Sequence, residues 1–271
     1  MRIYKYWKIA TTKIQFGYKE REISCYGGSN ISEADASTNA KEKLEKVKRK
    51  INGDSNIFDN YEVEIREEVV RVLDEGSIIT RNRYGAQVLN TENLMFLDID
   101  KPRFSFWDFF SPSNSDNKTR IIKMIHKLVP KPIYREYGFR IYETNKGIRL
   151  IVLGKKFDPR DLATHAMMSQ FNCDRLYMYL CKQQDCFRAR LTPKPSRIKV
   201  REPLWAKFPR DNKAEVEFQK WLLEYEKASK NFSVCKFVEQ LGANFYVRLP
   251  ETEIIKIHDD ITGATQNRQL A

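Results

Sequence analysis

The chain is poor in the residues on which many enzyme sites depend. Its 271 residues include three histidines and five scattered cysteines, so a Ser/His/Asp or Cys/His site has few candidates. Cys181 and Cys186 are five residues apart with no histidine nearby, which does not match a zinc site. Scattered thiols of this kind are typical of a reduced, cytoplasmic protein. The sequence also lacks the motifs Gly-x-x-x-x-Gly-Lys-Ser/Thr, Gly-x-Gly-x-x-Gly and Gly-x-Ser-x-Gly.

Long apolar segments are absent as well. No apolar run reaches the roughly 18 residues that a transmembrane helix needs, and the N-terminal residues lack the apolar core of a signal peptide. We therefore expect no membrane partner.

Glycine and proline are sparse, whereas 41% of the residues are hydrophobic and 12% aromatic. This composition predicts a folded protein rather than a disordered one.

Positive charge is what the chain has in excess. It carries 48 Lys and Arg against 36 Asp and Glu, a formal net charge of +12. Such a balance favours a polyanionic partner, with nucleic acid first and an anionic membrane surface second. The simpler alternative is a basic protein that lysine keeps soluble.

Hydrophobic periodicity predicts alternating strands and helices along the chain. We expect strands at 2–10, 13–17, 22–26, 86–90, 94–100, 139–143, 148–153, 187–191 and 245–249. We expect helices at 32–51, 64–74, 119–128, 158–171, 174–183, 212–230 and 233–241. Ser32 and Asp158 are placed to cap two of these helices, and 101–119 is expected to be a loop.

This mixture of hairpins and helices, without repeats, predicts an α+β fold around one central antiparallel or mixed sheet flanked by helices. We expect a small N-terminal strand–helix layer in residues 1–76, a core in 77–205 and a C-terminal helical appendage in 206–271. The alternative is that the three parts form one integrated domain.

The most informative segment ends an apolar strand in two aspartates. Asp98 and Asp100 are two residues apart, so on a strand their side chains point to the same face. Two such carboxylates can share Mg²⁺ or Mn²⁺ ions, which prefer oxygen ligands and also bind substrate phosphates. The alternative is that Asp100 forms a turn at the strand end, just before Lys101 and Pro102.

Basic segments downstream could supply phosphate contacts. In the turn 143–150, Gly147 permits close backbone approach, and Arg149 should lie on a strand beside the aspartates. In 186–197, two arginines alternate on one strand face, and no acid occurs between 186 and 201. The residues predicted to bind phosphate are Lys146, Arg149, Arg188, Arg190 and Lys194. Each segment could instead be an ordinary basic turn or strand.

Two further features remain open. Arg81, Arg83 and Tyr84, together with Arg197, are candidates for stacking on a base or gripping a nucleic-acid backbone, unless 81–85 is a structural turn. His258 and Asp259 resemble the start of a metal phosphohydrolase motif, but three histidines cannot complete that motif. A helix cap at Asp260 or Thr262 is therefore the preferred interpretation of that segment.

The order of these segments resembles the archaeo-eukaryotic primase and primase-polymerase superfamily. "FLDID" resembles the Asp-x-Asp strand of that family, and "ETNKGIRLIV" resembles its phosphate-holding hairpin, with Arg149 where the family has histidine. "CDRLYMYLCKQQDCFRARLTPKP" is similar to the third motif, with Asp174 as its acid and Asp185 as the rival. Over residues 77–197 the resemblance implies an RRM-like sheet and catalytic Mg²⁺ or Mn²⁺ held by Asp98, Asp100 and Asp174.

Three hypotheses about function follow. The first is a primase-like, divalent-metal-dependent protein that binds nucleotides or nucleic acid and, if active, transfers nucleotides from a nucleoside triphosphate or hydrolyses a phosphodiester. The second is a non-catalytic basic domain that binds DNA or RNA through the same arginines without metal. The third is a structural or regulatory α+β protein whose aspartates form a turn.

Overall fold

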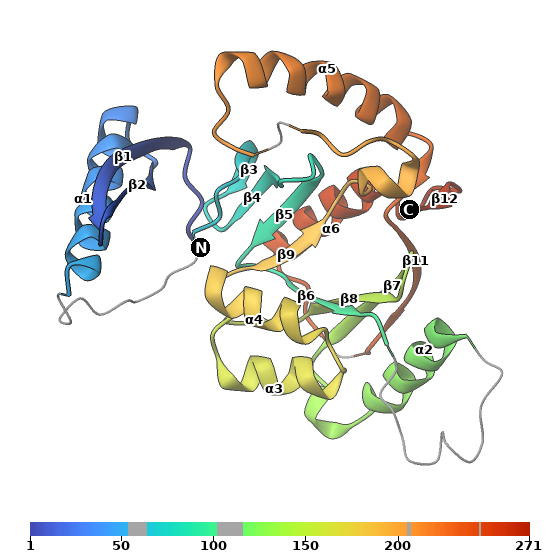
Figure 1. The fold of residues 1–271 in the computed structure, drawn as a ribbon. Helices are drawn as coiled ribbons and strands as arrows, with labels where there is room; N and C mark the ends of the chain where they lie inside the picture. The colour runs from blue at the N-terminus through green and yellow to red at the C-terminus, as the bar shows by residue number, and fades with distance from the viewer. Residues whose placement is uncertain (54–63, 102–115, 205–206, 244) are drawn as a thin grey trace.

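The computed structural model describes residues 1–53, 64–101, 116–204, 207–243 and 245–271. In these residues the chain has the expected α+β fold, with antiparallel sheets and helices packed around them (Figure 1). The predicted loop at 101–119 lies largely outside the described residues. Among the described helices, none is long and apolar enough to cross a membrane.

The N-terminal layer is a long hairpin with one helix packed on it (Figure 1). Strands β1 (Tyr6–Phe16) and β2 (Lys19–Ser29) pair antiparallel, so the two strands predicted at 2–10 and 13–17 are one continuous strand. Helix α1 (Glu33–Ile51) begins where predicted, because the Ser32 hydroxyl accepts a hydrogen bond from the backbone of its first turn. Its alanines lie close to β2, where a Cβ on Gly27 would be 2.1 Å from a helix backbone nitrogen.

A four-stranded antiparallel sheet, here called the outer sheet, follows in the order β3-β4-β5-β9. Its strands are β3 (Glu68–Asp74), β4 (Ser77–Arg81), β5 (Gln87–Thr91) and β9 (Phe187–Arg190). The helix predicted at 64–74 is therefore wrong: this segment contains three valines, which favour the pleated backbone, and it pairs with β4. The strand predicted at 187–191 is confirmed as β9, on the edge of the sheet.

A second four-stranded antiparallel sheet, the central sheet, has the order β11-β7-β8-β6. Its strands are β6 (Met95–Ile99), β7 (Gly138–Thr144), β8 (Ile148–Leu153) and β11 (Cys235–Leu241). The predicted hairpin at 139–153 is confirmed as β7 and β8. The strands predicted at 86–90 and 94–100 both exist, but β5 and β6 lie in different sheets. The helix predicted at 233–241 is wrong, because this segment pairs with β7 as β11.

In the described part of the chain, five α-helices follow the N-terminal layer. They are α2 (Asn117–Leu128), α3 (Leu162–Gln170), α4 (Arg175–Gln184), α5 (Asn212–Ser229) and α6 (Leu249–Thr262). The predicted helices at 119–128, 174–183 and 212–230 are confirmed. Asp161, not Asp158, caps α3. The strand predicted at 245–249 is wrong, since these residues lead into α6. The helix cap predicted at Asp260 or Thr262 is also wrong, because both residues lie within α6.

Helix α6 packs on one face of the central sheet. Its His258 ring lies 5.1 Å from the Tyr142 ring of β7 and 5.6 Å from the Phe96 ring of β6. On the opposite face, Phe171 at the end of α3 contacts Phe139 at 5.3 Å between ring centres. A sheet covered by helices in this way is compatible with an RRM-like arrangement. The C-terminal segment therefore contributes β11 and α6 to this core.

Candidate functional site

Asp98 and Arg149 face each other across β6 and β8. The sequence predicted that their strands are neighbours, and the structure makes the two residues direct partners in the antiparallel register. Arg149 Nε donates to Asp98 Oδ1 at 2.9 Å, and Arg149 Nη2 donates to Asp98 Oδ2 at 3.4 Å. Burial lowers the pKa of the Arg149 guanidinium, but the Asp98 carboxylate more than offsets this, so that its pKa lies above the ordinary value. Both oxygens of Asp98 are thus occupied by one arginine.

The remaining contacts of Arg149 connect three parts of the fold. Its side chain is only 3% exposed. Its Nη1 donates to the backbone carbonyl of Arg190 on β9 at 3.1 Å and lies 3.4 Å from His258 Nε2 on α6. Arg149 therefore joins the central sheet to the outer sheet and to α6. It does not project freely from its hairpin.

The two candidates for the third acid lie in different places. The Asp174 amide donates to the Asp98 carbonyl at 2.9 Å, which places the start of α4 beside the end of β6. The Asp174 carboxylate caps α4 by accepting from the Tyr177 amide at 2.7 Å. Asp185 lies at the other end of α4 and pairs with Arg160 at 3.0 Å. Of the two, Asp174 is the one that contacts β6.

This arrangement does not fit a divalent metal ion. Mg²⁺ and Mn²⁺ need several free oxygen ligands. Asp98 gives both oxygens to Arg149, and Asp174 gives one oxygen to the backbone of α4. Among the described residues, no group of three His, Cys, Asp or Glu side chains is placed to hold a metal ion. Of Asp98, Asp100 and Asp174, Asp100 is the exposed one, and its side chain has no partner in the described part of the chain.

Four cations gather beside the two aspartates, and we call them the cationic cluster. Its members, which come from the β7–β8 turn, from β9 and from the segment that follows β9, are Lys146, Arg190, Lys194 and Arg197. Burial lowers the pKa of Lys194, and the other three members lower it further, while Asp100 opposes them. Backbone contacts agree with this grouping, because Gly147, next to Lys146, packs against Asp100, and the Arg190 carbonyl accepts from Arg149. The fold thus unites residues that are far apart in the sequence.

Arg190 is the least compensated member of this cluster. Burial, followed by the charges of Arg197 and Arg149, lowers its pKa to about 10. Its Nε atom is buried and has no hydrogen-bond acceptor among the described residues. No carboxylate in the described ranges forms an ion pair with it. Arg81, Arg188 and Arg248 also have a buried Nε without an acceptor in the described residues, so Arg190 is set apart by its lowered pKa and its lack of a carboxylate partner there.

A cleft of about 880 Å³ lies between the N-terminal hairpin and the outer sheet. Trp7 and Tyr26 of the hairpin line it, as do Arg83 and Tyr84 of the β4–β5 turn. The Arg83 guanidinium lies over the Tyr84 ring at 4.9 Å. Asp98 also lines the cleft, so the cleft extends to the Asp98–Arg149 pair. Aromatic rings and cations along one cleft are the features on which unpaired bases and phosphates are bound.

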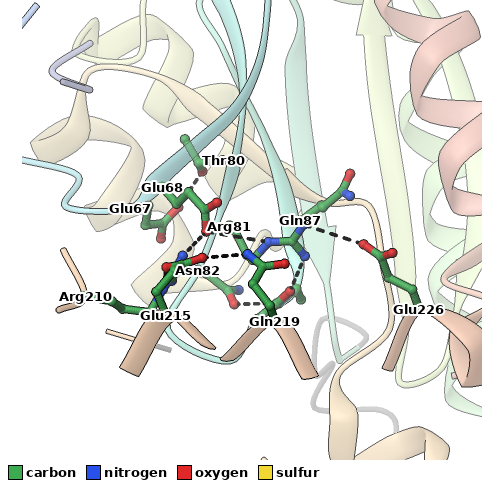
Figure 2. A network of polar contacts seen from close by, with 12 residues as sticks. Glu67, Glu68, Thr80, Arg81, Asn82, Gln87, Arg210, Glu215, Gln219 and Glu226 are labelled. Carbon is green, nitrogen blue, oxygen red and sulfur yellow. Dashed lines mark hydrogen bonds and ion pairs between the residues drawn. The ribbon is translucent and has the colours of Figure 1, made fainter. Parts of the chain in front are cut away.

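Two arginines that were candidates for ligand contacts are held by glutamates. Arg188 Nη2 donates to Glu67 at 2.6 Å. Arg81 donates to the Gly85 carbonyl at 3.0 Å and pairs with Glu68 and Glu226 at 3.8 and 3.7 Å. Figure 2 shows how Arg210 and Glu215 extend this second network. Sequence reasoning did not identify these glutamate partners, because Glu67 and Glu68 fall in the segment wrongly predicted to be helical.

Gly147 makes a close approach of a different kind from the one predicted. A Cβ at this position would lie 2.1 Å from the Ile99 carbonyl and 2.9 Å from the Asp100 Cα. The space in front of this glycine is therefore filled by the end of β6, not by a ligand. Gly147 allows the turn to pack against the strand that carries the aspartates.

Sequence reasoning singled out His258 together with Asp259 but missed its contact with Arg149. His258 lies 109 positions from Arg149, and only the packing of α6 on the central sheet brings the two together. The sequence signal was the His258–Asp259 pair itself.

Comparison of the chain with protein-family models, with curated proteins and with solved structures found no match.

Proposed function

We propose that the protein binds nucleic acid by holding its phosphates on the cationic cluster, without a bound metal. The observation that carries this proposal is Arg190, a cation with a buried Nε, no acceptor among the described residues and like charges around it. A buried charge is unfavourable unless a partner of opposite charge compensates it. A phosphate supplies both that charge and oxygens that match the guanidinium donors.

The cleft reaches Asp98, whose charge also acts on Arg190, and its lining favours a polynucleotide over a small anion. Its aromatic residues Trp7, Tyr26 and Tyr84 offer surfaces for bases, and the net charge of +12 favours a polyanion. The proposal is tested by titrating a labelled oligonucleotide at several salt concentrations. Neutralising Arg190 should weaken binding and reduce its salt dependence.

Primase-like, metal-dependent nucleotide transfer is a second candidate. It is supported by the position of Asp98 and Asp100 at the end of β6, next to β8, with Asp174 bonded to Asp98 through its backbone. It requires Asp98 to leave Arg149 before a metal can bind. A shift of the melting temperature with Mn²⁺ would support this candidate over the first.

A further inference from the structure

A polar network with a buried centre runs from the cleft across the central sheet to β7. It begins at Asp98, passes through Arg149 to His258, and continues to Asp259 and Arg140. His258 is fully buried. Its Nδ1 lies 2.9 Å from Asp259 Oδ1, and Asp259 Oδ2 accepts from Arg140 Nη2 at 2.8 Å. Such a network is expensive to leave unsatisfied, so its members constrain one another.

The contacts of His258 define its neutral form. Asp259 accepts a hydrogen bond, so Nδ1 carries the proton. Nε2 then has a lone pair, and Arg149 Nη1 donates to it at 3.4 Å. A protonated His258 would direct an N–H at this donor instead. The contact between His258 and Arg149 is therefore possible in only one of the two charge states.

Every element around His258 contributes a polar or charged group. Asp259 lies on the same helix, Arg149 on β8, and Cys235 on β11 with its Sγ 4.0 Å from Nε2. Tyr142 of β7 packs its ring edge-on against the imidazole. From β6, Asp98 acts through Arg149. Burial lowers the pKa of His258, but Cys235 and Asp259 outweigh this and raise it above the ordinary value, while Arg149 opposes them.

We propose that His258 is a positioning residue for Arg149 and makes phosphate binding at the cationic cluster depend on pH. This inference rests on the proposed function. When His258 is neutral, it holds Arg149 from behind the sheet. When it takes up a proton, it releases that contact and adds a positive charge behind Arg149 and Arg190. Phosphate affinity therefore rises as His258 becomes protonated.

The test compares oligonucleotide affinity at pH 6 and pH 8 in the wild type and in His258→Gln. Glutamine can accept from Arg149 but does not titrate. The ratio of the affinity at pH 6 to the affinity at pH 8 should be roughly three- to tenfold larger in the wild type than in His258→Gln. His165→Gln is the matched control, because His165 contacts the Pro159 carbonyl, which is not a member of this network, and the variant should keep the wild-type pH profile.

A second measurement does not depend on the variant folding. In ¹⁵N-labelled wild-type protein, the imidazole resonances of His258 report its tautomer and its titration. Neutral His258 should be the Nδ1–H tautomer, and saturation with oligonucleotide should raise its pKa by reciprocal linkage. A titration that does not move on saturation overturns the inference.

The outcomes separate the two proposals. If the affinities of the wild type and of His258→Gln change by the same factor between pH 6 and pH 8, His258 has no positioning role that depends on its charge. The inference is then wrong. If the wild type binds no oligonucleotide at either pH, the proposed function itself is wrong and the inference falls with it.

Discussion

Arg149 on β8 holds both carboxylate oxygens of Asp98 on β6, at 2.9 and 3.4 Å. The pair connects the buried guanidinium of Arg149 to an aspartate that lines the 880 Å³ cleft. Asp98 thereby compensates a buried charge and limits the positive potential beside Arg190. The same carboxylate cannot offer these oxygens to a metal while Arg149 holds them.

Removing the charge of Asp98 should separate these two roles. Asp98→Asn should lower the free energy of unfolding by about 1–3 kcal/mol, because Arg149 loses a charged acceptor in a buried position. It should also tighten oligonucleotide binding, because an acid beside the cationic cluster is gone. Urea denaturation and an oligonucleotide titration measure the two effects. Asp100→Asn is the control: it is exposed and should change unfolding by less than about 0.5 kcal/mol.

Metal addition should leave stability unchanged. Since Asp98 is bonded to Arg149 and Asp174 caps α4, Mn²⁺ or Mg²⁺ at millimolar concentration should not raise the melting temperature of the wild type. Differential scanning fluorimetry measures this directly. A rise that Asp98→Asn abolishes would instead show a metal at the aspartates and favour the primase-like candidate.

Arg190 should lower stability when no ligand is bound. Because burial and neighbouring cations lower its pKa to about 10, the charged form is disfavoured in the folded state. This penalty is fully present at neutral pH and declines only as pH rises from the folded pKa of about 10 toward the higher unfolded pKa. Arg190→Met should therefore be more stable than the wild type by about 1–2 kcal/mol at pH 7, with a smaller difference above pH 10.

The control for that variant lies on the same strand. Arg188 points to the same face of β9 as Arg190 but is paired with Glu67 at 2.6 Å. Arg188→Met should therefore destabilise the protein, because it removes the cation from a partly buried glutamate and leaves it the Thr80 hydroxyl. If both substitutions destabilise equally, Arg190 is compensated in a way that this account does not include.

Gly147 tests the packing that positions the aspartates. Gly147→Ala should destabilise the protein by about 2 kcal/mol or more, because the new methyl group would lie 2.1 Å from the Ile99 carbonyl and must displace the end of β6. Lys146→Ala in the same turn is exposed and should leave the unfolding midpoint nearly unchanged. Thermal denaturation of the two variants shows which interpretation of the turn is correct.

Local patterns predicted a large part of the fold. The apolar runs in 94–100 and 148–153 placed Asp98 and Arg149 on adjacent strands, and Ser32 marked the start of α1. β3 and β11 were wrongly predicted to be helices. Both segments have charged residues between apolar ones, and pairing with β4 and β7 decides their conformation.

The candidate site was predictable as a set of residues but not as a set of contacts. The alternation of Arg188 and Arg190 on β9 was visible in the sequence, yet one is paired with Glu67 and the other has no such partner in the described residues. That difference depends on Glu67, which is distant in the chain. The approach of His258 to Arg149 likewise depends on how α6 packs on the central sheet. Long-range packing of this kind leaves no local pattern.

The salt dependence of oligonucleotide binding tests the central claim most directly. Fluorescence anisotropy with a labelled single strand, from about 50 to 300 mM NaCl, should show affinity falling with salt in the wild type. Arg190→Gln should bind about tenfold more weakly at 100 mM NaCl, with the slope of log K against log salt reduced by about 0.7 for each lost phosphate contact. Lys220→Ala, an exposed residue of α5 paired with Glu217, should behave like the wild type. Equal affinity and equal slope in Arg190→Gln and the wild type would contradict the account.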